Sequence, residues 1–345
     1  MSNTHIDLIR YLFVLEVNTS LVWLPKWPAM DLSVLLGETI ADRLPIVEAR
    51  AWKKAMSAWR LACTDAQQRN GRSQISRKSC RSRIIHPGPW PIDAVIFWYP
   101  AKRSYGKGER ILFELKLLGS AADHALFIEV ILPAMEQISV TPPYGGQQYT
   151  NSLWGHFDIR SVYSANGHSW KPLVKNGALD LRRKINSTQW YSDLKFQACS
   201  YSSRNNITWL SPFLIRGFAG VVAEDDNNSG KKKSLCEPQL SLILESVAAR
   251  ICSILLGRHA TVEDFFNSLD HDERLSWKLA MDESFKTRIS ISNIRKSSDL
   301  VYELATGSQT FARPVPDVLI PYLQLGSILH IGEYTHFGCG TYFVA

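Results

Sequence analysis

The last seventeen residues of the sequence, 329–345, constrain most strongly what this chain can fold into. Three glycines, Gly332, Gly338 and Gly340, interrupt a run of apolar and aromatic residues there. Glycine permits positive φ and a close approach of two backbones. We therefore expect a strand, an exposed glycine-rich loop at 326–340 and a second strand.

Two common phosphate-binding loops do not fit this stretch. A P-loop needs Gly-Lys-Ser/Thr at the start of a helix, and a dinucleotide fingerprint needs a helix N-terminus after its glycines. Residues 341–345 leave no room for such a helix. Two interpretations remain: a loop whose N–H groups face an extended anion such as an RNA strand, or a tight hairpin without a ligand.

Three blocks of this sequence resemble one protein family. Residues 323–342, Leu-Gln-Leu-Gly-Ser-Ile-Leu-His-Ile-Gly-Glu-Tyr-Thr-His-Phe-Gly-Cys-Gly-Thr-Tyr, are similar to the C-terminal signature of the CRISPR-associated endoribonucleases that cut precursor CRISPR RNA. These enzymes belong to the repeat-associated mysterious protein (RAMP) superfamily. Residues 201–205 and 214–222 resemble its Ser-x-Arg and Gly-Phe-x-Gly strands, and residues 105–121, preceded by His86-Pro87, resemble its N-terminal half.

The resemblance implies an α+β fold of two ferredoxin-like (RRM-like) domains in tandem. We place the N-terminal domain at 1–165 and the C-terminal domain at 166–345. The family usually runs more directly from the Gly-Phe-x-Gly strand to the terminal loop, so we interpret 237–285 as a helical insertion in the second domain.

Local patterns support this order of elements. Residues 111–118 alternate between apolar and mixed positions, which is typical of a half-buried strand. Leu244, Val247 and Ile251 share one face of a predicted helix, and this face should be buried. Thr261–Asp264 and Asp270–Glu273 have the spacing of capping boxes at the start of two short helices.

The charge of the chain favours a polyanionic partner. The formal net charge is +7 at pH 7, and the pI is near 9.0. Residues 69–83 contain several basic residues and no acid, among them Arg77, Lys78 and Arg81. We predict that this loop contacts RNA phosphates, although a solvated linker is the commoner fate of such a run.

The sequence contains no pattern typical of disulfide-bonded, metal-binding, membrane-spanning, exported or serine-hydrolase proteins. The six cysteines have no close pair, which fits reduced thiols better than disulfides or a zinc site. No apolar run approaches a membrane span, and the N-terminal residues carry no export signal. There is no His-Glu-x-x-His or Gly-x-Ser-x-Gly pattern. We expect a cytoplasmic protein without a metal or another cofactor.

The reaction implied by the resemblance is attack of a 2′-OH on the neighbouring phosphate. It needs a base, an acid and cations, and it needs no metal. The family often places a histidine after the first strand or along the first helix, whereas this chain has none between His5 and His86. We therefore predict that Lys26 and His336 take part, against the alternatives of a solvent-exposed lysine and a surface histidine.

Arginines near glycines are the candidates for phosphate contact. Arg204 and Arg216 lie in the strand-like blocks, where their guanidinium groups suit phosphate but are equally able to pair with an acid. The resemblance adds backbone contacts from the glycines of both blocks. These are Gly217, Gly220, Gly332, Gly338 and Gly340.

The sequence thus predicts a protein that binds CRISPR repeat RNA and cleaves precursor CRISPR RNA into mature guide RNA. Other CRISPR effector subunits are possible partners, and neither a membrane nor direct contact with DNA is expected. The missing N-terminal histidine leaves a non-catalytic RNA-holding subunit as the alternative. A general RNA-binding protein unconnected with CRISPR is a third hypothesis.

Overall fold

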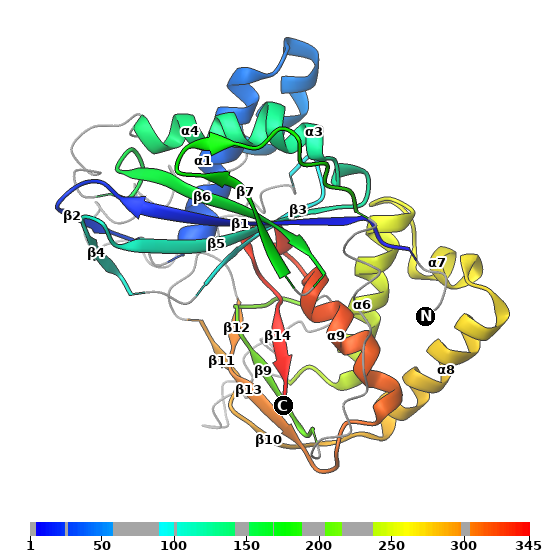
Figure 1. Ribbon diagram of the computed structural model, residues 1–345. Helices are drawn as coiled ribbons and strands as arrows, with labels where there is room; N and C mark the ends of the chain where they lie inside the picture. Colours follow the sequence, from blue (N-terminus) through cyan, green and yellow to red (C-terminus); the bar gives the residue numbers. More distant parts are fainter. Residues whose placement is uncertain are drawn as a thin grey trace, which may run out of the picture. The chain divides into compact units, whose positions relative to one another are not determined.

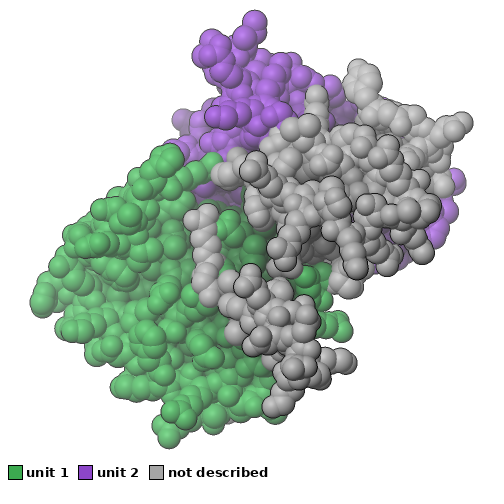
Figure 2. Space-filling model, turned by 180° about the vertical axis from the view of Figure 1, so that it is seen from behind, with its two compact units in different colours: residues 1–6, 194–345 green, residues 7–193 purple. Residues whose placement is uncertain are grey.

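The computed structural model divides the chain into two compact units. Unit 1 comprises residues 1–6 and 194–345, and unit 2 comprises residues 7–193 (Figure 2). We describe each unit by itself. The residues that the structure describes are 5–24, 27–57, 90–99, 102–141, 152–167, 169–187, 204–215, 237–297 and 304–345.

Unit 2 is built on a six-stranded antiparallel sheet with the order β3-β5-β1-β6-β7-β8. The strands are β1 (Leu8–Val17), β3 (Ala94–Trp98), β5 (Arg110–Leu118), β6 (Phe157–Asn166), β7 (Ser169–Lys175) and β8 (Ala178–Leu179). A separate two-stranded ribbon joins β2 (Leu21–Trp23) to β4 (Ser104–Gly106). Residue 165, at which the sequence analysis divided the chain, lies within β6.

Helices cover one face of this sheet (Figure 1). They are α1 (Pro28–Arg43) and a second helical segment made of α3 (His124–Leu126), the π-helix η2 (Phe127–Ile131) and α4 (Leu132–Val140), which follows the short 3-10 turn η1 (Gly119–Ala121). Tyr11 stacks on Phe127 at 3.6 Å between ring centroids, and Phe13 stacks on Phe113 at 4.6 Å. Odd-numbered residues of β1 and β5 therefore form the core under the helices. The strand predicted at 111–118 is confirmed, but the prediction that it is half-buried is wrong, because Glu114 and Lys116 on its other face are buried as well.

On the face of these strands away from α1 and α4, Arg10 of β1 and Glu114 and Lys116 of β5 belong to a charged network that is largely buried. Arg10 Nε lies 2.5 Å from Glu114 Oε1, and the Tyr99 hydroxyl donates to Glu114 Oε2 at 3.3 Å. Burial alone would raise the pKa of Glu114, but Lys116, Arg10 and these hydrogen bonds outweigh it and hold the pKa below its ordinary value. Burial lowers the pKa of Lys116 to about 8.

Unit 1 contains a four-stranded antiparallel sheet with the order β10-β13-β9-β14. Its strands are β9 (Asn206–Trp209), β10 (Ile289–Ser292), β13 (Ser308–Phe311) and β14 (Tyr342–Val344). The chain of β10 continues into β11 (Arg295–Lys296), which pairs with β12 (Ala305–Thr306) in a short ribbon.

The helices of unit 1 are α6 (Leu240–Leu255), α7 (Val262–Ser268), α8 (His271–Lys286) and α9 (Ile320–Leu329), which follows the 3-10 turn η4 (Asp317–Leu319). Helices α6 and α9 pack together, and α9 contacts β14 (Figure 1). Leu244, Val247 and Ile251 of α6 are buried, which confirms the face that the sequence predicted. The capping box of Thr261 and Asp264 is also confirmed, and Asp270 accepts the N–H of Glu273 at the start of α8.

These elements confirm the predicted α+β class with antiparallel sheets. In unit 2 the order strand, helix, strand, strand, helix, strand is seen in β1, α1, β3, β5, α4 and β6. Among the described residues, no helix is both long enough and apolar enough to span a lipid bilayer.

Candidate RNA-binding loop

The glycine-rich loop of unit 1 differs from the strand and exposed loop that the sequence predicted. Residues 320–329 form helix α9, and residues 330–341 then lead into β14. Ile331, Phe337 and Cys339 are buried. The predicted first strand and exposed loop are therefore wrong, because the apolar residues of 320–329 pack at helical spacing into the core.

Two of the glycines are required by backbone packing. A Cβ atom at Gly340, where φ is +81°, would overlap the carbonyl oxygen of Ile331. A Cβ atom at Gly332, where φ is +84°, would overlap the carbonyl oxygen of Leu214. An L side chain at either position would need both a disfavoured conformation and a displaced backbone.

The loop is hydrogen-bonded to the segment 211–214, which follows β9. The N–H of Gly340 donates to the Pro212 carbonyl at 2.9 Å, and the N–H of Glu333 donates to the Leu214 carbonyl at 2.7 Å. The N–H of Gly338 donates within the loop, to Thr335 at 2.8 Å. These three amides are therefore engaged inside the protein in this conformation.

This contact joins two of the three sequence blocks. Residues 332–340 belong to the terminal block, and Leu214 opens the block that continues through Arg216, Gly217 and Gly220. The last three residues lie outside the described part of the chain. A hydrogen bond from the loop thus fixes the position of Leu214, the first residue of that block.

His336 lies in the 3-10 turn η5 (Thr335–Phe337) and is 7% exposed. Its ring centroid lies 3.8 Å from that of Phe337. Burial, and then the charges of Arg250 and Arg258, lower the pKa of His336 to about 3. The imidazole is therefore neutral at physiological pH, and the positive charges of two guanidinium groups disfavour its protonation.

Arg250 and Arg258 were missed by the sequence analysis. Arg250 lies on α6, where its Nε donates to the Leu329 carbonyl at 3.3 Å, at the end of α9. Arg258 lies in the exposed turn after α6. Both fall in the segment assigned to a helical insertion, and no sequence pattern linked them to the glycine loop.

A second histidine of the loop has an internal role. His330 is fully buried, and its Nδ1 lies 3.0 Å from the Cys339 carbonyl. Its φ is +59° and that of Tyr334 is +58°, although neither residue is glycine. Such conformations persist only where the surroundings fix them, so the loop has one well-defined backbone course.

The other predicted site residues are only partly within the described chain. Arg204 immediately precedes β9, its side chain is half-buried, and its carbonyl accepts the N–H of Val315 at 2.6 Å. The remaining predicted residues outside the described ranges are Lys26, Arg77, Lys78 and Arg81. Within those ranges there is also no group of three or more His, Cys, Asp or Glu side chains placed to hold a metal ion.

The sequence matches no protein-family model and no curated protein. Solved structures do match the fold. The chain aligns over 99% of its length with a partial Cas6-RT-Cas1–Cas2 complex, with a TM-score of 0.52 and 12% identity, covering 46% of that chain. A second Cas6-RT-Cas1–Cas2 complex gives the same TM-score and identity, and 29% of its chain is covered. This protein therefore spans less than half the length of either matched chain.

Thermus thermophilus Cas6 aligns over 99% of both chains, with 11% identity and a TM-score of 0.44. The two structures with a TM-score of 0.52 are both assemblies that contain Cas6, a CRISPR-associated protein, in line with the family that the sequence blocks resemble. At these identities the comparison establishes a likeness of fold between this chain and Cas6-containing structures.

Proposed function

We propose that this protein binds CRISPR repeat RNA and cleaves precursor CRISPR RNA to give mature guide RNA. The observation that carries the proposal is the hydrogen-bonded contact between residues 332–340 and 212–214. Two blocks that resemble the same endoribonuclease family, separated by about a hundred residues in the sequence, meet in space there. The likeness of fold to Cas6-containing assemblies supports the same function.

We further propose that the two units are tandem ferredoxin-like domains. The sheet orders β3-β5-β1-β6 and β10-β13-β9-β14 correspond strand for strand when the elements are taken in chain order. In this correspondence α6 takes the place of α1, and α9 takes that of α4. The inserted segment is then α7 and α8, a shorter stretch than the 237–285 that the sequence suggested.

The proposed reaction is attack of the 2′-OH on the adjacent phosphate, without a metal. His336 is neutral and able to accept a proton, but a group with a pKa of about 3 is a weak base. A phosphate bound near Arg250 and Arg258 would offset their charges, which are the smaller causes of the shift after burial, and would raise the pKa of His336 in part. Lys26 remains the second proposed participant.

The burial of His336 favours one alternative, a non-catalytic subunit that holds repeat RNA. In that case the imidazole would be a packing group, and the glycine loop would only shape the unit. Such a subunit would retain RNA binding, with other CRISPR effector subunits as proposed partners. We place both activities in the cytoplasm.

The decisive experiment incubates the purified protein with the repeat RNA of its own genome, with and without EDTA. We expect cleavage in both conditions and a 2′,3′-cyclic phosphate on the product. Lys26→Ala and His336→Ala should each lower the rate about a hundredfold or more with RNA binding retained. His271→Ala, which removes an exposed histidine at the start of α8, is the matched control and should keep full activity.

Phosphate contacts are tested separately. Arg204→Ala should weaken RNA binding as well as the rate. The triple variant Arg77→Ala, Lys78→Ala, Arg81→Ala should lower affinity and the slope of log affinity against log salt without changing which RNA is preferred. Tight binding with no cleavage by the wild type would select the non-catalytic alternative, and no RNA binding at all would reject both.

A further inference from the structure

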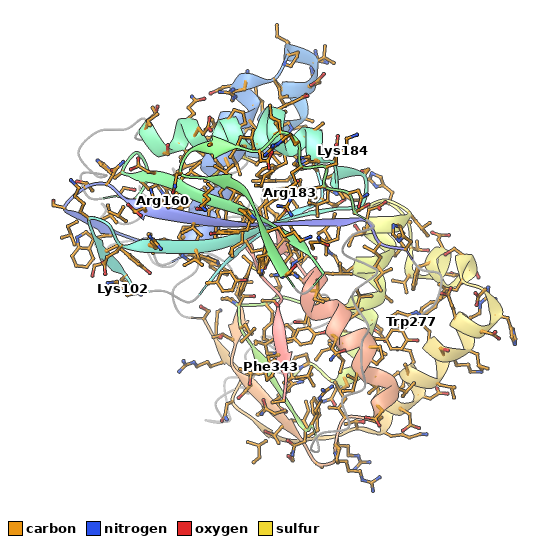
Figure 3. All side chains as sticks on the ribbon, in the orientation of Figure 1. Lys102, Arg160, Arg183, Lys184, Trp277 and Phe343 are labelled. Atoms are coloured by element: carbon orange, nitrogen blue, oxygen red, sulfur yellow. The ribbon has the colours of Figure 1, made fainter. Side chains whose placement is uncertain are left out.

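The face of the unit 1 sheet away from α9 presents an exposed aromatic ring. Neighbouring residues of a strand point to opposite faces of a sheet. Tyr342 of β14 is 1% exposed, and its hydroxyl donates to the Leu323 carbonyl of α9 at 2.8 Å. The next residue, Phe343, therefore lies on the face away from α9, where it is 58% exposed (Figure 3).

Short polar side chains lie beside this ring. Strand pairing places Thr208 opposite Phe343 and Ser308 opposite Thr208. The Thr208 hydroxyl donates to Asn206 Oδ1 at 2.8 Å, and Asn206 Nδ2 donates to the Thr310 hydroxyl at 3.0 Å. These half-buried groups form an ordered polar surface across the two central strands, next to an apolar ring.

The four strands of the sheet contain no charged residue, and the segments that flank them carry basic ones. The ranges 204–215, 287–297, 304–316 and 341–345 contain five basic residues and no Asp or Glu. The five are Arg204, Arg288, Arg295, Lys296 and Arg313. Arg204 has the same parity along the chain as Asn206 and Thr208, which assigns it to the same face. The surroundings of Phe343 therefore suit a polyanion.

An exposed ring and hydrogen-bonding groups on one antiparallel sheet, with cations in the segments beside its strands, match the needs of an unstacked base. Single-stranded nucleic acid is bound by stacking bases on aromatic side chains within a positive surface. A duplex hides its base faces, so a ring on a flat sheet can reach them only where nucleotides are unpaired. Basic residues without neighbouring acids favour an anionic ligand over a neutral protein surface.

We propose that this face binds unpaired nucleotides of RNA, with Phe343 stacking on a base, Asn206 and Thr208 beside the base edge, and the basic residues contacting phosphates. The inference rests on the proposed RNA-binding function and specifies the part of the RNA that is bound. It places a contact with single-stranded RNA on a surface distinct from the glycine loop, on the opposite face of β14 from α9.

The test compares Phe343→Ala with Phe343→Trp and with the control Phe285→Ala, which removes a ring that is 66% exposed on α8. The probes are a short single-stranded oligouridylate carrying one 2-aminopurine and a blunt RNA duplex. Phe343→Ala should lower affinity for the single strand at least about fivefold and abolish quenching of the 2-aminopurine fluorescence. Phe343→Trp and Phe285→Ala should bind as the wild type does, and affinity for the duplex should be unchanged throughout.

Contrary outcomes separate this inference from the proposed function. If the wild type binds the single strand and Phe343→Ala binds it equally well with the same quenching, the stacking surface is overturned while RNA binding stands. An equal loss for strand and duplex overturns it as well. Should Phe343→Ala lose self-association in sedimentation and keep its RNA affinity, the face is a protein contact. Wild-type protein that binds neither probe overturns both proposals.

Discussion

The sheets of the two units have corresponding strand orders, yet the faces that lie away from α4 in unit 2 and from α9 in unit 1 differ in charge and exposure. In unit 2 this face holds Glu114 and Lys116, which are 2% and 5% exposed and belong to a network with Arg10 and Tyr99. In unit 1 the equivalent face holds hydroxyl and amide groups beside the exposed ring of Phe343.

The difference shows that strand order does not determine what a sheet face is suited to do. Opposite charges that are buried together must be matched, because an uncompensated buried charge is strongly unfavourable. That requirement fits a fixed, internal face in unit 2. Neutral polar groups with a protruding aromatic ring tolerate water and are available to a ligand, which fits an open face in unit 1.

The largest expected effect is that of Glu114→Gln. Glutamine keeps the volume but leaves the Arg10 and Lys116 charges without their carboxylate, so we expect a loss of about 3–5 kcal/mol in the free energy of unfolding. Urea denaturation measures it. Thr310→Val on the unit 1 face is the control and should lose about 0.5–1.5 kcal/mol, the worth of a neutral hydrogen bond. Equal losses in the free energy of unfolding for the two variants would contradict the view that only the unit 2 face depends on matched buried charges.

Acid should act on unit 1 through His336. Its pKa is about 3 in the folded protein against 6.5 ordinarily, so between these values the unfolded chain binds a proton that the folded chain does not. Stability present above pH 6.5 is thus lost as the pH falls, by about 2 kcal/mol between pH 7 and pH 5. The pKa of Glu114 is lowered, so its carboxylate stays charged over this range.

The measurement is the pH dependence of unfolding for the wild type and for His336→Gln. The variant cannot take up this proton, so it should lack about 2 kcal/mol of the wild-type loss. Identical pH profiles would show that the imidazole is solvated or already charged in the folded protein. Amide hydrogen exchange would then locate the acid-sensitive unit.

The smallest expected effect is that of Phe343→Ala on stability. A ring that is 58% exposed contributes little to the core, so the free energy of unfolding should change by less than about 0.5 kcal/mol. Thermal denaturation measures this change. A loss above about 2 kcal/mol would mean that the ring is covered in solution, and the unit 1 face would then resemble that of unit 2.

Several helices and strands could be predicted from the sequence, because residues close to one another along the chain determine strand alternation, helix faces and helix caps. The strand at 111–118, the buried face of α6 and the capping box at Thr261 were predicted correctly, although the strand is buried on both faces over 113–118 and not on one. The same reasoning failed near the C-terminal glycines, where a strand and an exposed loop were predicted, whereas 320–329 form helix α9 and much of the loop is buried. Helix and strand periods are hard to distinguish over so short a run.

The loop could not be predicted in full because its determinants are distant in sequence. The overlap that requires glycine at position 332 is with Leu214, and the charges that act on His336 come from Arg250 and Arg258. No spacing within residues 329–345 contains that information. The exposure of Phe343 was equally inaccessible, because alternation alone does not say which face the helices cover.

The position of β14 also affects the order in which the chain can fold during synthesis. Strand β9 lies between β13 and β14, and the glycine loop ties residues 212–214 to residues 333–340. The unit 1 sheet is therefore completed only after residues 342–344 have left the ribosome, and long-range pairing of this kind is slow. Unit 2 pairs its strands within residues 8–179, so we expect it to fold while unit 1 is still being made.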